Sequence, residues 1–497
     1  MDEISASDLV GCQYRLRQRR DHPNIPKGHA AQERARRFNE ARQEVADKLP
    51  TKSDSRRIYF RRCDLGPLPA PDPWLRSLQT MEAIAAGYTH ITGAVFSTPT
   101  WVVGVDCLVR EGDTYTPVVV SNHRVARSSE RSRLPGVPTH RLGLSEPLQL
   151  RYRPRHHPVD GYQLGLAARG LAELGVDSGR GGLVGQDRSI VFFFDTARYQ
   201  PALTAALQQP VPTEPRRVKE CASCRFWSLC EKQLRAVDEI SLFLPGDRAR
   251  SYRDNGIHTV QGLIDADLGE ASQLARAWRE GIPVLQRAGA RPEGIPRAEV
   301  EIDIDMEAYL DHGAYLWGAW YADKYHSFAT WSQLGGSAEA ANFAEFWNWL
   351  MAIRDQAAAE GRSFRAYCYS AHGENHWMRM SARRFGTPTP EEVEEFIASE
   401  HWIDVFAYVK KSLVGPSGIG LKVIAPEAGF SWRQEDIDGE ESVNARRRAV
   451  GSGPEALSAR ESLLMYNADD VQATRVVREW LSAGAPGIPS LEDKSPR

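Results

Sequence analysis

The sequence predicts an α/β protein built from several domains. Its 497 residues are too many for one hydrophobic core, so two to four domains are expected. Hydrophobic residues make up 42% and charged residues 26%, which is ordinary for a soluble globular chain. Residues 300–307 alternate between apolar and acidic side chains, which is typical of a strand, and residues 463–474 begin an amphipathic helix.

Charge and targeting signals narrow the class of protein. A formal net charge of −3 gives no overall nucleic-acid signature, so any basic surface is local, as at 14–20 (YRLRQRR) and 56–62 (RRIYFRR). The sequence has no apolar run that would span a bilayer, and its acidic start lacks the pattern of a signal peptide. We therefore expect a cytoplasmic protein without a membrane partner, in which structural disulfides are uncommon.

Three of the seven cysteines have the spacing of metal ligands. Cys221, Cys224 and Cys230 form the pattern C-x2-C-x5-C, and a two-residue gap lets two thiolates reach one metal centre from a single turn. Cys12 is the best candidate for a fourth ligand. Zinc fits this spacing as well as an iron–sulfur cluster does, and three buried free cysteines are the simplest alternative.

The motifs between these cysteines resemble a known nuclease family. His29 lies in KGHAAQERARRF, Asp106 lies in the strand-like GVD, and Gln163 lies in the helical GYQLGLAARGL. With the cysteines at both ends, residues 1–235 resemble the RecB-like nucleases that carry an iron–sulfur cluster, including the CRISPR-associated four-cysteine exonucleases. The resemblance implies a PD-(D/E)xK (restriction-endonuclease-like) α/β domain whose two ends are joined by a 4Fe–4S cluster.

The catalytic residues of that family are incomplete in this sequence. Its chemistry needs a second acid and a lysine on the strand after Asp106, but Val119 and Ser121 occupy those positions. The chain has no lysine between residues 52 and 219. We therefore predict that the N-terminal domain is catalytically degenerate and binds nucleic acid or acts as a scaffold. His123 or Arg124 in the role of the lysine is the alternative.

A small helical connector is expected at residues 236–290. Its short helix-like segments are separated by glycines, and GIHTVQGL (256–263) is similar to part of a helix-hairpin-helix element, in which backbone N–H groups face a phosphate. A small linking bundle is the alternative. Residues 287–300, rich in Pro, Gly and Arg, are expected to form an interdomain linker.

The second half of the chain opens with an acidic strand. One face of the expected strand is apolar and the other carries four carboxylates, Glu301, Asp303, Asp305 and Glu307. Adjacent carboxylates repel one another unless cations neutralise them, so the face suggests a metal site. An exposed acidic edge strand is the alternative. GAYLWGAWY (313–321) is expected to form the antiparallel partner strand.

Further polar residues follow at the starts of predicted helices. Glu374 lies at the beginning of one helix, Asp404 near the beginning of another, and Lys422 follows in GIGLKVIAPEAGF. Tyr466 and Asp470 share one helix face because they are four residues apart. An acidic strand is thus followed by helices that begin with acidic residues and by a final helix with a Tyr-x3-Asp motif. This order is the second pattern in the chain that suggests a catalytic site.

This order resembles the RNase H-like exonucleases of the DEDD superfamily, in the subgroup whose last motif is Tyr-x3-Asp (DEDDy). It is most similar to the predicted exonuclease domain found after RecB-like domains in putative bacterial nucleases, here at residues 296–485. The resemblance implies that four acids hold two Mg²⁺ or Mn²⁺ ions and that a tyrosine orients the attacking water: Asp305, Glu307, Glu374, Asp470 and Tyr466. Asp303 with Asp305 is an alternative register, and Asp404 and Lys422 are candidates for supporting roles.

The expected function is therefore a metal-dependent nuclease, a 3′→5′ exonuclease on DNA with its chemistry in the C-terminal domain. Two divalent cations about 4 Å apart suit an in-line phosphoryl displacement. An RNA exonuclease is one alternative. A non-catalytic nucleic-acid-binding protein with two decayed nuclease folds is the other. A helicase or another repair protein as partner follows by family analogy alone.

Overall fold

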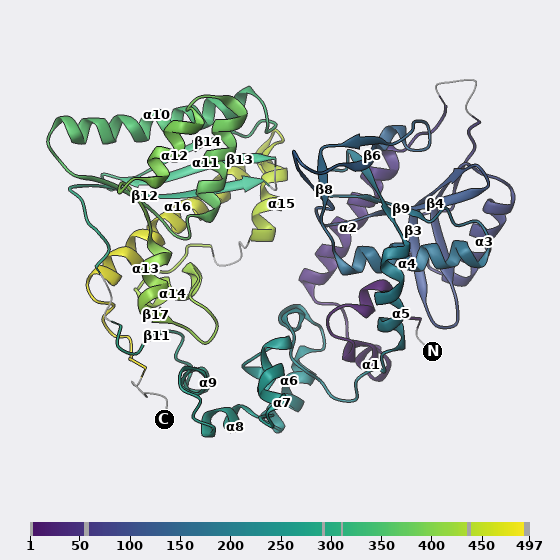
Figure 1. Ribbon diagram of the computed structural model, residues 1–497, viewed down its shortest axis with the longest axis horizontal. Helices are drawn as coiled ribbons and strands as arrows, with labels where there is room; N and C mark the ends of the chain where they lie inside the picture. The colour runs from purple at the N-terminus through teal and green to yellow at the C-terminus, as the bar shows by residue number, and fades with distance from the viewer. Residues whose placement is uncertain (1–2, 54–58, 291–293, 310–311, 435–438, 492–497) are drawn as a thin grey trace. The chain divides into compact units, whose positions relative to one another are not determined.

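The computed structural model describes residues 3–53, 59–290, 294–309, 312–434 and 439–491. The chain separates into two compact units, Met1–Val260 and Gln261–Arg497 (Figure 1). The boundary falls inside the segment 236–290, so the residues expected to form a connector are divided between the two units. Within the described ranges, no helix has the length and apolar character needed to cross a membrane.

The first unit is a mixed α/β structure. Its strands are β1 (Arg62–Asp64), β2 (His90–Ser97), β3 (Val102–Glu111), β4 (Thr114–Val120), β5 (Ala126–Ser128), β6 (Leu134–Pro138), β7 (Leu148–Leu150), β8 (Tyr152–Pro154), β9 (Arg180–Val184) and β10 (Ile190–Asp195). Its helices are α1 (Tyr14–Asp21), α2 (His29–Lys48), α3 (Pro73–Ala85), α4 (Pro158–Glu173), α5 (Gln200–Gln208), α6 (Trp227–Ala236) and α7 (Arg250–Asp254). Helix α8 (Val260–Asp265) crosses the unit boundary.

Eight of these strands form one sheet in the order β1-β2-β3-β4-β9-β10-β6-β7. The pairs β2–β3 and β3–β4 are antiparallel, whereas β4 and β9 are parallel and are connected through α4. Helix α2 packs through Val45, together with Leu49 just after its end, on one apolar cluster, and α4 packs through Leu166 and Leu171 on a different one. The core of this unit is therefore a helix-covered sheet with an antiparallel meander followed by a helix and a parallel strand.

The second unit contains its own sheet and its own core. Its strands are β11 (Leu285–Gln286), β12 (Val300–Tyr309), β13 (Gly313–Tyr321), β14 (Lys324–Ala329), β15 (Phe364–Cys368), β16 (Trp402–Asp404) and β17 (Leu413–Val414). Its helices are α9 (Glu270–Glu280), α10 (Ser337–Ala359), α11 (His372–Phe385), α12 (Pro390–Ala398), α13 (Val405–Ser412), α14 (Leu421–Glu427), α15 (Gly439–Ala449) and α16 (Pro454–Ser482).

Strand β12 lies at the centre of the five-stranded sheet, whose order is β14-β13-β12-β15-β16. It pairs antiparallel with β13 and parallel with β15, which confirms the predicted partner strand. Ile302 and Ile304 of β12 are buried against α10, α11 and α12 on one face. The acidic residues alternate with them and point to the other face, where α16 packs on β12. The alternation thus directs all four carboxylates toward α16.

Helix α16 confirms the helix predicted at 463–474 and extends it in both directions (Figure 1). Val471, Thr474 and Val477 are buried as expected. Its buried face also includes polar residues, among them Asn467, Asp469, Asp470 and Arg478, which a purely structural helix would bury only with partners. The partners lie on β12, on β14 and on the loop after α14, and they define the candidate site.

Candidate metal centre

Three carboxylates from two elements converge in the second unit. Asp305 and Glu307 of β12 and Asp470 of α16 each place one oxygen so that the three atoms lie within 4.8 Å of one another. Among the described residues, these three side chains are the set of His, Cys, Asp or Glu residues whose possible ligand atoms lie this close together. Carboxylate oxygens at this spacing suit a hard divalent cation such as Mg²⁺ or Mn²⁺.

Burial and mutual repulsion perturb these carboxyl groups. Burial, followed by the charges of Asp470, Glu307 and Glu374, raises the pKa of Asp305 well above its usual value. Burial and the charges of Asp470 and Glu374 raise the pKa of Glu307 to about 8. Such a set is destabilised as anions unless a cation enters, so the electrostatics favour metal binding.

Glu374 faces the same cluster from another element. It lies in the first turn of α11, is 5% exposed, and is close enough for its charge to raise the pKa of both Asp305 and Glu307. Burial, together with the charge of Asp404, raises the pKa of Glu374 to about 8. Glu374 is not within the 4.8 Å group of three, so in the structure it borders the centre.

Asp404 and Lys422 flank the centre in different ways. Asp404 caps α13, because its carboxylate accepts hydrogen bonds from the backbone N–H groups of Phe406 (3.0 Å) and Ser370 (2.9 Å). Lys422 lies in the first turn of α14, and its Nζ is 5.1 Å from the centre of the Tyr466 ring. The positive charge of Lys422 opposes the rise in the pKa of Glu307 and of Asp470.

Tyr466 lies one turn before Asp470 on α16, and its side chain is mostly buried at 8% exposure. Burial raises the pKa of Asp470, and hydrogen bonds from Trp432 and Tyr466 together with the charge of Lys422 oppose this rise. Burial and the charges of Asp470, Glu307 and Asp305 raise the pKa of the Tyr466 hydroxyl. The tyrosine is thus a neutral hydroxyl held against the carboxylates.

Asp303, the alternative first acid, has a different environment. It is 2% exposed, and its two oxygens accept hydrogen bonds from Nε and Nη2 of Arg478, both 2.9 Å long. The third guanidinium nitrogen of Arg478 donates to Glu301 at 2.9 Å. A fully paired carboxylate is a poor ligand, so the geometry favours the register Asp305-x-Glu307.

The sequence did not reveal two polar residues that contact the carboxylates. Asn467 is fully buried, and its Nδ2 donates to Oδ2 of Asp305 at 2.8 Å, while its Oδ1 accepts from the Tyr325 hydroxyl at 2.7 Å. Nε1 of Trp432 donates to Oδ1 of Asp470 at 2.7 Å. Asn467 lies inside the Tyr-x3-Asp motif, and this position could have marked it as a site residue. Nothing in the sequence pointed to Trp432.

The candidate site of the first unit contains an arginine beside its aspartate. One oxygen of Asp106 is 3.0 Å from Nε of Arg42, and the other accepts a hydrogen bond from the backbone N–H of Val120 at 2.7 Å. Burial raises the pKa of Asp106, and the charge of Arg42 is the largest opposing effect. Arg42 of α2 therefore neutralises the negative charge of Asp106, which in a metal site a cation would neutralise.

The other residues expected around Asp106 have structural contacts. Val119 is fully buried, and Ser121 donates a 2.6 Å hydrogen bond to Asp160. The side-chain amide of Gln163 donates to the backbone oxygen of Gly104 at 2.9 Å. His123 stacks on the ring of His157, with ring centres 4.0 Å apart. The side chain of His29 lies outside the described part of the structure, and the backbone of Arg124 is hydrogen bonded to His157.

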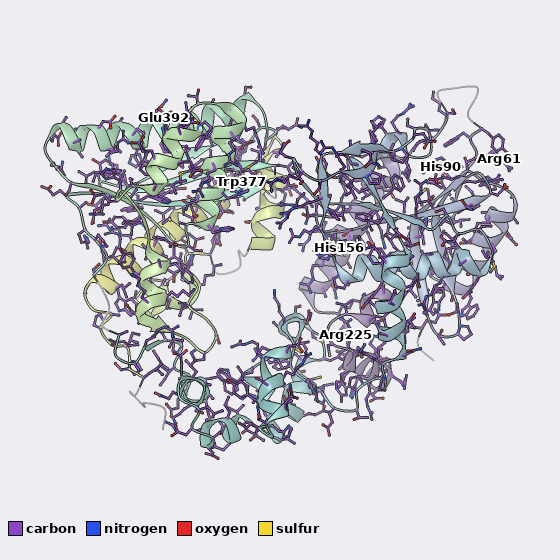
Figure 2. All side chains as sticks on the ribbon, viewed as in Figure 1. Arg61, His90, His156, Arg225, Trp377 and Glu392 are labelled. Atoms are coloured by element: carbon purple, nitrogen blue, oxygen red, sulfur yellow. The ribbon has the colours of Figure 1, made fainter. Side chains whose placement is uncertain are left out.

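Four cysteines that are far apart in sequence line one pocket in the first unit: Cys12, Cys221, Cys224 and Cys230. Burial and the neighbouring sulfurs raise the pKa of Cys230 to about 12. Two sulfurs accept N–H donors, Cys230 from Gln18 at 3.6 Å and Cys221 from the backbone of Val218 at 3.3 Å. Arg225, labelled in Figure 2, links the segment that contains Cys221, Cys224 and Cys230 to the N-terminal segment that follows Cys12. Its Nη1 donates a hydrogen bond to the backbone oxygen of Ile25 at 2.6 Å.

Comparison with known proteins bears on the second unit. Residues 303–482 match the model of the RNase H superfamily, and this range begins in β12 and ends with α16. No curated protein and no solved structure matched the chain. The match contains the three converging carboxylates and the strand order described above. The second unit of this chain therefore contains an RNase H-like domain.

Proposed function

We propose that the protein is a metal-dependent nuclease that hydrolyses phosphodiester bonds in the RNase H-like domain, as a 3′→5′ exonuclease on DNA. The observation that carries the proposal is the convergence of Asp305, Glu307 and Asp470 from opposite ends of the domain. Glu374 adds a fourth carboxylate at the place of the second motif, where DEDDy exonucleases usually carry an aspartate. Polarity and the choice of DNA rest on that resemblance.

The chain's own residues have distinct roles in this reaction. Asp305, Glu307, Glu374 and Asp470 would hold two Mg²⁺ or Mn²⁺ ions. When bound, the ions supply Lewis-acid stabilisation of the attacking and leaving oxygens of a phosphodiester. The Tyr466 hydroxyl, held beside Asp470, would orient the attacking water. Lys422, at the rim and beside Tyr466, would contact a substrate phosphate.

For the first unit we propose a PD-(D/E)xK-type domain that has lost its catalysis and binds nucleic acid or serves as a scaffold. The meander β2-β3-β4, followed by α4 and the parallel strand β9, supports this topology. The Arg42–Asp106 pair supports the loss of catalysis, because a cation already neutralises the aspartate. Val119 offers no second ligand.

The four cysteines are proposed to hold a 4Fe–4S cluster, with zinc as the alternative. A tetrahedral zinc with four thiolate bonds would bring the sulfurs to about 3.8 Å from one another. The resemblance of residues 1–235 to iron–sulfur nucleases favours a cluster, and the four cysteines line one pocket. The N–H donors on Cys221 and Cys230 suit thiolate sulfurs.

The nuclease proposal is tested with the purified full chain, Mn²⁺ and 3′- or 5′-labelled single-stranded DNA. We expect progressive shortening from the 3′ end by the wild type and a loss of at least about 100-fold in Asp305→Ala, beyond the effect of changing a residue that only supports a ligand. Asp106→Asn is the matched control in the other unit and should stay within about twofold of wild type.

Other outcomes have defined meanings. Equal activity in Asp305→Ala would move the chemistry away from this centre, and a loss in Asp106→Asn alone would assign it to the first unit. Faster degradation of a matched RNA strand would show that RNA, and not DNA, is the preferred substrate. Binding of either strand without any cleavage would support a non-catalytic nucleic-acid-binding protein.

A further inference from the structure

The acids of β12 are held by two different kinds of partner. Asp303 accepts both of its hydrogen bonds from Arg478, a cation. Asp305, two residues further along the same face, accepts from the amide of Asn467, which is neutral. The hydroxyl of Tyr325 fixes the other end of that amide, so Asn467 can present only its N–H group to Asp305.

The same contrast occurs between neighbouring acids on α16. Asp469 is 1% exposed and accepts from the backbone N–H of Arg433 at 2.9 Å and from its Nε at 2.7 Å. Asp470, the next residue, accepts from the neutral indole of Trp432 at 2.7 Å. In each element an acid outside the centre, Asp303 or Asp469, is paired with an arginine, and an acid inside it receives a neutral N–H group.

A neutral donor and a cation have different effects on a metal ligand. An arginine in contact neutralises the carboxylate and competes with an incoming cation. A neutral N–H group fixes the rotamer of the carboxylate but leaves its negative charge in place. The carboxylates of the centre repel one another, so without a donor they would turn apart in the absence of metal.

We infer that Asn467 and Trp432 are positioning residues that hold Asp305 and Asp470 in the metal-binding arrangement without offsetting their charge. This inference rests on the proposed metal centre. Each donor contacts one oxygen of its carboxylate, Oδ2 of Asp305 or Oδ1 of Asp470, so the pair acts on metal affinity through the ligands. Lys422 contributes its charge from the rim, and it is a separate element of the site.

The packing around Asn467 supports a fixed position for its amide. Asn467 is fully buried, and a Cβ atom at Gly318 of β13 would lie 1.7 Å from its Oδ1. Glycine at this position therefore leaves the space that the amide fills. The donor to Asp305 is built into the contact between β13 and α16.

The test is Mn²⁺ binding to the full chain, measured by titration calorimetry. Trp432→Phe keeps the ring and removes only the N–H group, and Asn467→Leu removes the amide. We expect the Mn²⁺ affinity to fall about 10- to 100-fold in each variant, as for other residues that orient metal ligands. Excess Mn²⁺ should restore the turnover rate on DNA, with an unchanged KM for DNA.

Trp480→Phe is the matched control, because the indole of Trp480, on α16, donates to the backbone oxygen of Pro486 and not to a carboxylate of the centre. An unchanged affinity in Trp432→Phe, or an equal loss in Trp480→Phe, would overturn the inference. Asp305→Ala separates the two proposals: if it binds Mn²⁺ like the wild type, the metal centre itself is wrong. If Asn467→Leu fails to fold, Trp432→Phe, at a partly exposed position, decides the matter.

Discussion

The carboxylate of Asp303 and the guanidinium of Arg478 form two hydrogen bonds of 2.9 Å at positions that are 2% and 1% exposed, respectively. The pair joins β12, the central strand, to α16, the last long helix. It lies one strand repeat from Asp305 and so fixes the distance between the two elements that carry the converging carboxylates.

Arg478→Met should therefore destabilise the second unit strongly. Removing one partner leaves the other charge buried, which costs about 3–5 kcal/mol. Urea unfolding followed by tryptophan fluorescence measures this change. The double variant Asp303→Leu/Arg478→Met should recover most of the loss, because it removes both charges. A single variant as stable as the wild type would show that the pair contributes little.

The metal-free protein should lose stability as the pH rises. The pKa of Glu307 rises from 4.5 to about 8 in the folded state. Between these values the folded chain binds more protons than the unfolded chain, so the free energy of unfolding decreases with rising pH. Thermal unfolding in a chelator should thus give a lower midpoint at pH 8.5 than at pH 5.5.

Glu307→Gln should reduce this pH dependence, because the amide does not ionise. Its stabilising effect should be present at pH 8.5 and absent at pH 3.5, below both pKa values. Glu395→Gln on α12 is the control, since Glu395 is exposed. A Glu307→Gln variant with the wild-type pH dependence would contradict the assigned electrostatics.

Gly318→Ala should weaken both stability and metal binding. The new Cβ would lie 1.7 Å from Oδ1 of Asn467, so the strand or the amide must move. Overpacking of this kind costs about 1–3 kcal/mol. Gly336→Ala is the control, since its Cβ would have no neighbour within 4 Å. Thermal unfolding and Mn²⁺ titration of both variants provide the measurement.

The cysteine pocket should contain iron and sulfide after anaerobic purification, with broad visible absorbance. Cys221→Ser should lower the iron content and the thermal stability of the first unit, because the pocket joins Cys12 to a segment more than two hundred residues away. The Cys368→Ser variant, changed at a buried cysteine of the second unit, should keep its iron. Stoichiometric zinc in place of iron would assign the pocket to zinc.

The sequence was most informative where a residue pattern repeats. The period-two alternation of 300–307 predicted β12 and its acidic face, and the i, i+4 pair Tyr466 and Asp470 predicted the inner face of α16. The sequence left open whether Asp303 or Asp305 is the first acid of the Asp-x-acid motif, because both side chains point to the same face of the strand. Only Arg478, 175 residues away from Asp303, separates them.

Other contacts have no local pattern in one sequence. Trp432 contacts Asp470 from 38 residues away, and its indole carries no charge that would mark it as part of a site. The missing lysine predicted that the first unit had lost its catalysis. It did not predict that Arg42, an unremarkable residue of a long helix, would pair with Asp106.

The centre takes its ligands from the first strand and the last helix of the domain, at residues 305 and 470. During synthesis the chain emerges from its N-terminal end, so β12 is exposed long before α16 has been made. A nascent chain, or a fragment that ends before α16, carries the acidic strand without its closing aspartate. Under the proposed function, the domain therefore cannot cut the nucleic acids around the ribosome until nearly all of it has been translated.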